Sequence, residues 1–324
     1  MDFLRILLAC SAFLSRFTSL FVILMGAAAF ACPRLFTWVH GDAQTIVLGV
    51  IMLAMGMTLS KKDFAVLAKN PLAIAIGAIA QYTIMPLLAF GISRTLHLDP
   101  AIATGLVLVG CCPGGVSSNI MSFLCRGDVA LSVGMTTVST LLAPVVTPLL
   151  VLHLAGAEIA VDAYGMFKSI VIVTILPVVL GLILNTLAGR TRAYGIVLGL
   201  MPGVAVIGLG CIVGGVIAAD GSFFLKSSAV VFLAVLLHNF GGYLLGYLAA
   251  KFTRMNRARR RTLSIEVGMQ NAGLATVLAN KHFPTLPGAE VVSAISCVWH
   301  SVSGALIAGL FVWLDRRRNH KGEG

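Results

Sequence analysis

Long apolar stretches alternate with short polar or charged segments along the whole chain. A membrane-spanning helix needs about 20 apolar residues, and runs of this kind recur with charges or turn residues between them. The pattern predicts ten spanning helices, at residues 13–32, 42–60, 71–93, 101–125, 129–154, 163–188, 195–218, 227–251, 262–281 and 288–314. The expected fold class is therefore an all-α polytopic membrane protein embedded in the lipid bilayer.

The loop charges predict how the chain is oriented. With the N-terminus in the cytoplasm, 18 of the 23 Lys and Arg residues fall in cytoplasmic segments and 5 fall outside. Such an excess of positive charge on the cytoplasmic side is typical of spanning proteins. Both termini are therefore predicted to be cytoplasmic. The first span resembles a signal peptide, but Arg16 within its apolar region favours retention.

Composition excludes several other classes of protein. Hydrophobic residues make up 58% of the 324 residues and charged residues 11%, which no soluble fold can bury. The net charge of +11 comes from short clusters between apolar stretches, so it does not indicate a nucleic-acid partner. The seven cysteines show no C-x-x-C spacing, and we expect free, buried thiols without a disulfide framework or a metal site.

The ten predicted spans divide into two groups of five, with the boundary in the acidic linker around Glu158 and Asp162. Because each half has an odd number of spans, the second half enters the membrane from the opposite side. This predicts two inverted repeats, residues 1–157 and 158–324. The fourth span of each half is interrupted, by Pro113–Gly115 and by Gly268–Gly273. Paired interruptions of this kind indicate a binding site near the bilayer midplane.

Only one acidic residue, Glu266, lies inside a strongly apolar span. An acid at a helix centre costs about 2.5–3.5 kcal/mol on insertion scales, so we expect a cation or a proton to compensate it. Gln270 and Asn271 follow it closely, and glycines allow the backbone between them to unwind. The alternative is a hydrogen-bonded cluster that only packs helices.

Further polar groups follow the first interruption. Ser117, Ser118 and Asn119 come directly after it, and the next span carries Ser132, Thr136, Ser139 and Thr140. Residues 132, 136 and 140 share one helix face, although such hydroxyls also simply pack membrane helices. Gln81 is a lone amide in the third span, open to the same two interpretations.

Hydroxyl, amide and carboxylate oxygens suit a hard cation. Sodium is the first candidate, and a proton on Glu266 is the alternative. Helices that restart after the two breaks would direct their positive N-terminal ends at the same place, which favours an anionic substrate. For His238 and His300, the expected state is a buried neutral ring beside a backbone carbonyl.

A set of longer motifs carries a family resemblance: Gly-Cys-Cys-Pro-Gly-Gly at 110–115, Ser118-Asn119, Asp-Val-Ala-Leu-Ser at 128–132, Ile-Glu-Val-Gly-Met-Gln-Asn at 265–271 and Val-Trp-His at 298–300. Over essentially its whole length the chain resembles a bacterial member of the bile acid:sodium symporter family. The resemblance implies two five-helix inverted repeats that form a core domain (71–154 and 227–314) and a panel domain (13–60 and 163–218), with two broken helices crossing in the core.

The resemblance also implies two sodium sites. The first would consist of the side chains of Ser118, Asn119, Ser132, Thr136 and Glu266. The second would consist of Gln81, Glu266 and Gln270, together with the carbonyls of Val267 and Met269. The substrate would lie in the crevice between panel and core, beside Val116, Ser117, Asn271, His300 and Ser301. Val116 stands where relatives often carry threonine, and Ser301 where many carry asparagine.

The function expected from these features is sodium-coupled import of a small organic anion by alternating access. Pantoate-like or other short hydroxy or keto carboxylates are preferred, and bile acids are the other substrate class. The alternatives are a proton-coupled carrier that uses Glu266 and a passive anion facilitator or channel. A channel should show a ring of pore-lining charges, and no catalytic spacing of an enzyme occurs in the chain. We expect a monomer in the cytoplasmic (inner) membrane of a bacterium.

Overall fold

The computed structural model describes residues 2–60, 63, 70–156, 159–226 and 228–322. Within these ranges the chain is helical, without strands, apart from one isolated β-bridge. The helices are α1 (Asp2–Arg16), α2 (Thr18–Ala31), η1 (Pro33–Leu35), α3 (Asp42–Thr58), α5 (Pro71–Thr95), α6 (Pro100–Cys111), α7 (Ser118–Leu124), α8 (Val129–Leu154), α9 (Ala163–Ile170), η2 (Val171–Ile175), α10 (Leu176–Ala188), α11 (Arg192–Lys226), α12 (Ser228–Phe252), α13 (Arg257–Gly268), α14 (Ala272–His282) and α15 (Pro287–Gly322).

Each of the ten predicted spans contains helix, but not every one is a single long helix. Among the described residues, six helical segments are long and apolar enough to cross a membrane: 71–95, 129–154, 163–188, 192–219, 229–252 and 287–317. The bent pair α1–α2 makes a seventh if it is counted as one span. The all-helical polytopic membrane fold is therefore confirmed. The number of ten crossings, and the repeat boundary near Glu158, which lies outside the described residues, stay predictions.

The predicted first span, residues 13–32, contains a sharp bend that the sequence pattern did not predict. The chain bends by 87° between Leu4–Arg16 and Thr18–Ala31, so residues 13–16 and 18–31 belong to two differently directed helices, α1 and α2. Arg16 and the flanking Ser15 and Thr18 interrupt the apolar run, and the Thr18 hydroxyl donates back to the Ser15 carbonyl (2.9 Å). A hydropathy window averages over such a bend and does not detect it.

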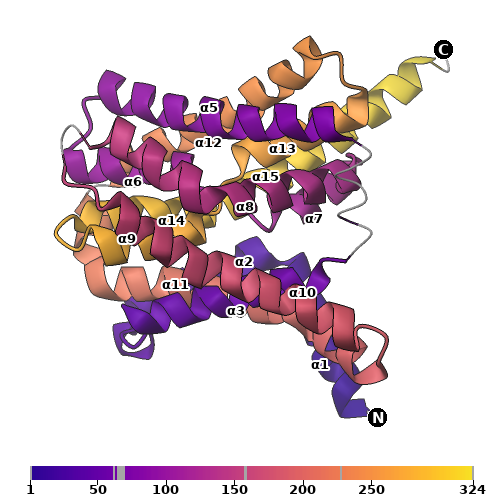
Figure 1. Ribbon diagram of the computed structural model, residues 1–324, viewed down its shortest axis with the longest axis horizontal. Coiled ribbons are helices and arrows are strands. Elements are labelled where there is room, and N and C mark those ends of the chain that lie inside the picture. Colours follow the sequence, from indigo (N-terminus) through magenta and orange to yellow (C-terminus); the bar gives the residue numbers. More distant parts are fainter. Residues whose placement is uncertain (1, 61–62, 64–69, 157–158, 227, 323–324) are drawn as a thin grey trace.

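The helices form two groups that lie one above the other in Figure 1. Helices α3, α10 and α11 pack together with α1 and α2 in the lower part, whereas α5, α6, α8, α12 and α13 lie in the upper part. Both chain termini lie at the same end of the molecule (Figure 1). Within the lower group α3 and α10 approach so closely that a Cβ at Gly56 would lie 2.2 Å from the Val178 carbonyl. Small residues allow such close packing where apolar burial alone does not drive association.

Candidate ion and substrate site

The two helix interruptions meet in space. Helix α6 ends at Cys111 and α7 begins at Ser118, while α13 ends at Gly268 and α14 begins at Ala272. The intervening segments form an antiparallel β-bridge between Gly114 and Gln270. Gly115 donates its N–H to the Met269 carbonyl, and Asn271 donates its N–H to the Pro113 carbonyl (2.8 Å each). Each break thus satisfies backbone groups of the other, which non-helical backbone at membrane depth requires.

Glycine at position 115 is needed for this contact. A Cβ at Gly115 would lie 2.8 Å from the Gln270 carbonyl oxygen, closer than a side chain can approach backbone. A Cβ at Gly114 would lie 3.2 Å from Oε2 of Glu266. The glycine pair therefore brings the bridge and the buried carboxylate together.

Glu266 lies almost fully buried in the last turn of α13. Its carboxylate accepts hydrogen bonds from the hydroxyls of Ser118 (2.6 Å), Thr136 (2.8 Å) and Ser132. The Asn119 side-chain oxygen lies 2.8 Å from the Ser132 hydroxyl oxygen and 3.4 Å from the Thr136 hydroxyl oxygen. The five residues expected at the first sodium site are therefore neighbours, although they come from three different helices.

The chemistry of this cluster suits a monovalent cation. Three hydroxyls, one amide oxygen and one carboxylate face the same point, and a hydroxyl can rotate to present a lone pair in place of its proton. None of the ion pairs in the described chain includes Glu266; they join arginines to Asp128 and Asp315. Because a buried carboxylate without a cationic partner is unfavourable, the cluster is suited to take up a hard cation through oxygen atoms.

The residues expected at the second sodium site form a separate group. Gln81 donates to the Gln270 side-chain oxygen (2.5 Å), and Gln270 donates to the Val267 carbonyl (2.7 Å). The Met269 carbonyl instead accepts the Gly115 N–H in the bridge. In the described residues no hydrogen bond joins Glu266 to Gln81 or Gln270. That the Glu266 carboxylate binds both sodium ions therefore stays a prediction.

A cavity of about 420 Å³ adjoins the bridge. One wall comes from α3 and α11, and the opposite wall from the bridge, the start of α14 and α15. The residues expected at the substrate all line it: Val116, Ser117, Asn271, His300 and Ser301. Its described lining contains no Lys or Arg, and it extends to Ser15, Thr58 and Asp63.

The polar groups in this wall are held in defined positions. Asn271 caps α14, because its side-chain oxygen accepts the Leu274 N–H (3.0 Å), and its amide nitrogen lies 3.8 Å from the Met52 sulfur. Nδ1 of His300 lies 3.3 Å from the Gln270 carbonyl. The Ser301 hydroxyl donates to the Cys297 carbonyl (3.1 Å). His300 is thus a buried ring beside a carbonyl, as expected, and so is His238, whose Nε2 lies 3.1 Å from the Met85 carbonyl.

Sequence reasoning missed several groups that support the breaks. Asn239 donates to the Gly268 carbonyl (2.7 Å) and Thr147 donates to the Cys111 carbonyl (2.7 Å), so each satisfies a carbonyl near a helix end. An amide inside an apolar span was the available signal for Asn239, whereas Thr147 stands out in no pattern. Of the predicted hydroxyl stripe, Ser132 and Thr136 reach Glu266, but Thr140 does not. All seven cysteines are free, but the prediction that they are buried is wrong for Cys10 and Cys32, which are exposed, and for Cys211, which is half-buried.

Comparison with known proteins identifies the family. The family model described as the sodium bile acid symporter family matches residues 45–227. The sodium-dependent transporter YocS of Bacillus subtilis (strain 168), itself described as uncharacterized, is 44% identical over 308 residues, which cover 95% of this chain and 94% of that protein. The chain belongs to the sodium/bile acid symporter family.

Plant relatives of this family member are also similar along most of its length. The probable chloroplastic sodium/metabolite cotransporter BASS1 of Oryza sativa subsp. japonica is 42% identical over 297 residues, which cover 92% of this chain and 72% of that protein. BASS1 of Arabidopsis thaliana is 42% identical over 279 residues, covering 86% and 69%. The family and these relatives are transporters, so the chain is a membrane transporter and not an enzyme.

Proposed function

We propose that this protein is a sodium-coupled symporter that imports a small organic anion by alternating access. The names of its relatives indicate sodium coupling. The observation that carries the proposal is the buried Glu266 carboxylate, which is surrounded by oxygen-bearing side chains and lies beside the bridge between the two broken helices, next to a cavity that Asn119 and Gln270 also line.

In this proposal the first sodium ion binds between Ser118, Asn119, Ser132, Thr136 and Glu266. The second binds near Gln81 and Gln270, where the Val267 carbonyl is released from its bond to Gln270. Both ions would then order the segments on either side of the bridge. The ordered bridge fixes Asn271 and the start of α14 against the cavity.

The charge balance explains why sodium would be required for anion binding. The described cavity lining offers no cationic side chain, so an anion has to be stabilised by other charges. Two sodium ions and one Glu266 carboxylate leave a net charge of +1 behind the bridge. The N-terminus of α14 adds the partial positive charge of a helix dipole. A monovalent anion would therefore bind well only when the ions are present.

A short hydroxy or keto carboxylate, such as a pantoate-like compound, fits this environment. Its carboxylate would lie at Asn271 and the start of α14, with Val116, Ser117, His300 and Ser301 around the rest of the molecule. The volume of about 420 Å³ lies within the usual range of small-molecule sites. Val116 and Ser301 are the positions where side-chain exchange should change substrate preference.

The two inverted repeats would together form a panel domain (13–60 and 163–218) and a core domain (71–154 and 227–314). Alternating access would move the panel domain against the core domain. Polar contacts join the two domains at one end: Gln44 donates to Glu290 (2.9 Å), and His282 and Ser169 lie 2.9 Å apart. The cavity extends toward the opposite end, at Ser15 and Thr58. With both termini cytoplasmic, in a bacterial inner membrane, this arrangement is an inward-facing state of a monomeric carrier.

Uptake and binding measurements test the proposal together. Purified protein in liposomes should accumulate radiolabelled pantoate or a related carboxylate under an inward sodium gradient, and not under an equal gradient of N-methylglucamine. In thermal unfolding, carboxylates should stabilise the protein only with sodium present. Uptake driven by a pH step without sodium would instead establish a proton-coupled carrier. Uptake that does not depend on the sodium gradient or on the pH gradient would establish a facilitator. If bile acids raise the unfolding temperature and short carboxylates do not, the substrate class is bile acids.

A further inference from the structure

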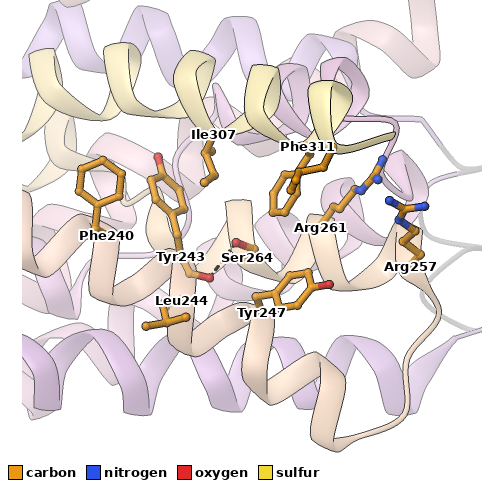
Figure 2. Close-up of a pocket in the computed structure, with 10 residues that line it drawn as sticks. Phe240, Tyr243, Leu244, Tyr247, Arg257, Arg261, Ser264, Ile307 and Phe311 are labelled. Carbon is orange, nitrogen blue, oxygen red and sulfur yellow. Dashed lines mark hydrogen bonds between the residues drawn. The ribbon is translucent and has the colours of Figure 1, made fainter. Parts of the chain in front are cut away.

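A second large concavity lies on the other side of α13, away from the bridge. It has a volume of about 520 Å³ and lies between α12, α13 and α15, as Figure 2 shows. Most of its lining is apolar or aromatic, and two arginines lie at one end. The lining residues are Phe240, Tyr243, Leu244, Tyr247, Arg257, Arg261, Ser264, Ile307, Phe311 and Leu314. We call this concavity the α12–α15 groove.

The groove has an apolar body. The rings of Tyr247 and Phe311 stack with centroids 6.0 Å apart, and Phe240 packs edge-on against Tyr243. Leu244 is 59% exposed, so the groove opens on the outside of the helix bundle. Ser264, at its base, already donates to the Tyr243 carbonyl (2.7 Å). The body of the groove therefore offers a ligand mainly apolar contacts. The Ser264 hydroxyl at its base is already hydrogen-bonded within the protein.

The two arginines lie together at one end (Figure 2). Arg257 and Arg261 both contact the same Asp315 oxygen, at 2.6 and 2.5 Å, and Arg261 also donates to the Cys125 carbonyl (2.9 Å). Two guanidinium groups and one carboxylate leave a net charge of +1. Each guanidinium has five N–H donors, and the described contacts use one nitrogen of Arg257 and two of Arg261. This end can therefore still bind an anion.

The position of the groove in the membrane decides which anion it meets. Its apolar body faces the space that lipid chains fill around a spanning bundle, while Arg257 begins α13 at the end of the molecule where both termini lie. Basic clusters at the ends of spanning helices recognise acidic lipid headgroups. We propose that the α12–α15 groove binds an anionic phospholipid, with an acyl chain along the aromatic wall and the phosphate against Arg257 and Arg261.

This proposal is independent of the transport function and goes beyond it. It adds a lipid site on α13, the helix that also carries Glu266. Because the lipid would contact the outer face of this short helix, it is expected to stabilise the folded protein. The site requires a phosphate and an acyl chain in one molecule, which distinguishes it from a site for a free anion.

The test compares lipids that differ only in headgroup charge. Native mass spectrometry of the full-length protein in detergent should show phosphatidylglycerol binding about fivefold more tightly than phosphatidylcholine with the same chains, since one arginine near the membrane surface contributes about 1 kcal/mol. Arg257→Gln should abolish this preference. Arg254→Gln is the matched control, because Arg254 lies in the preceding loop but does not line the groove, and it should keep the preference. Leu244→Trp, which narrows the groove, should weaken the binding of both lipids.

Three results would overturn the proposal. Equal binding of the two lipids by the unaltered protein would remove the headgroup contact. If the Arg254 and Arg257 variants lose the preference for phosphatidylglycerol equally, the preference comes from the basic loop in general and not from a site in the groove. Displacement of phosphatidylglycerol by millimolar glycerol phosphate would show that the groove end binds a free anion without its acyl chain.

Discussion

At the scale of single residues, Glu266 determines whether the site binds a cation. Glu266→Gln keeps the size of the side chain and removes the charge that three hydroxyls now contact. We expect the variant to insert and fold, but to lose sodium-stimulated uptake and the rise in unfolding temperature with sodium. The control is Asp99→Asn, which preserves the cap of α6 far from the site and should transport normally. Sodium stabilisation of the Glu266→Gln variant would contradict the ion assignment.

Thr136 and Asn271 allow ion binding and anion binding to be separated. Thr136→Ala removes the hydroxyl that lies 2.8 Å from Glu266 and that would turn a lone pair toward the ion; by analogy with a hydrogen bond to a charged group, this contact contributes about 1.5–3 kcal/mol. Sodium affinity measured by calorimetry should fall by about 10- to 100-fold, and anion affinity should fall with it, because coupling between two ligands is reciprocal. Thr140→Ala, on the same helix but without a bond to Glu266, should change neither.

Asn271→Ala should have the opposite effect. This side chain lines the cavity and caps α14, but it does not contact Glu266. Anion binding should weaken strongly, whereas sodium binding without anion should remain nearly unchanged. Equal anion affinity in sodium and in a large inert cation, for the unaltered protein, would disprove the symport mechanism.

At the scale of helices and their breaks, the contact between the two interrupted segments depends on Gly115. Gly115→Ala places a methyl group 2.8 Å from the Gln270 carbonyl, so the bridge has to open. Overpacking of this kind typically costs about 1–3 kcal/mol, and we expect lower thermal stability together with loss of sodium-dependent transport. Gly91→Ala is the matched control, since a Cβ there meets nothing within 4 Å in helix α5. Normal transport by the Gly115 variant would show that the bridge is dispensable.

The helices were predictable from sequence where apolar runs are long and bounded by charge, as at α5, α8 and α12. The bend at Phe17 was not, because a hydropathy window averages over the few polar residues that surround it. The two breaks were visible as Gly and Pro clusters, but their mutual pairing joins residues more than 150 positions apart, such as Gly114 and Gln270, and no local pattern encodes it. The ion set came from a family resemblance. The α12–α15 groove is formed by three helices together and has no sequence signature of its own.

At the scale of the whole molecule, the orientation can be tested directly. Single cysteines at Thr253, before the arginine-rich start of α13, and at Tyr164, in the first turn of α9, mark opposite ends of the predicted topology. On a cysteine-free background in intact cells, a membrane-impermeant maleimide should label position 164 and not position 253. Permeabilised cells should label both, as the control for reactivity. Labelling of both in intact cells would contradict the inverted-repeat topology.

The closed end of the proposed carrier rests on a small polar network. Gln44 on α3 donates to the buried Glu290 on α15 (2.9 Å), and Asn280 on α14 donates to the other oxygen of the same carboxylate (3.0 Å). Gln44 lies in the proposed panel domain, and the other two lie in the proposed core. The Gln44–Glu290 bond can persist only while the two domains touch at this end. Removing it therefore destabilises this state relative to one that is open to the outside.

Gln44→Leu should shift the carrier toward the outward-open state. Loss of a hydrogen bond to a charged group, at about 1.5–3 kcal/mol, changes the ratio of the two states by about 10- to 100-fold. A cysteine introduced at Ser117 in the cavity, on a cysteine-free background that still transports, should then react faster with an impermeant thiol reagent from outside. Thr45→Val is the control, because the Thr45 hydroxyl bonds only within its own turn, to Gly41. Uptake by the Gln44 variant should slow, since the return to the inward-facing state becomes less favourable. If external labelling at position 117 does not rise above that of the Thr45 control, the Gln44–Glu290 contact is packing between the two domains and not the closure of an outer gate.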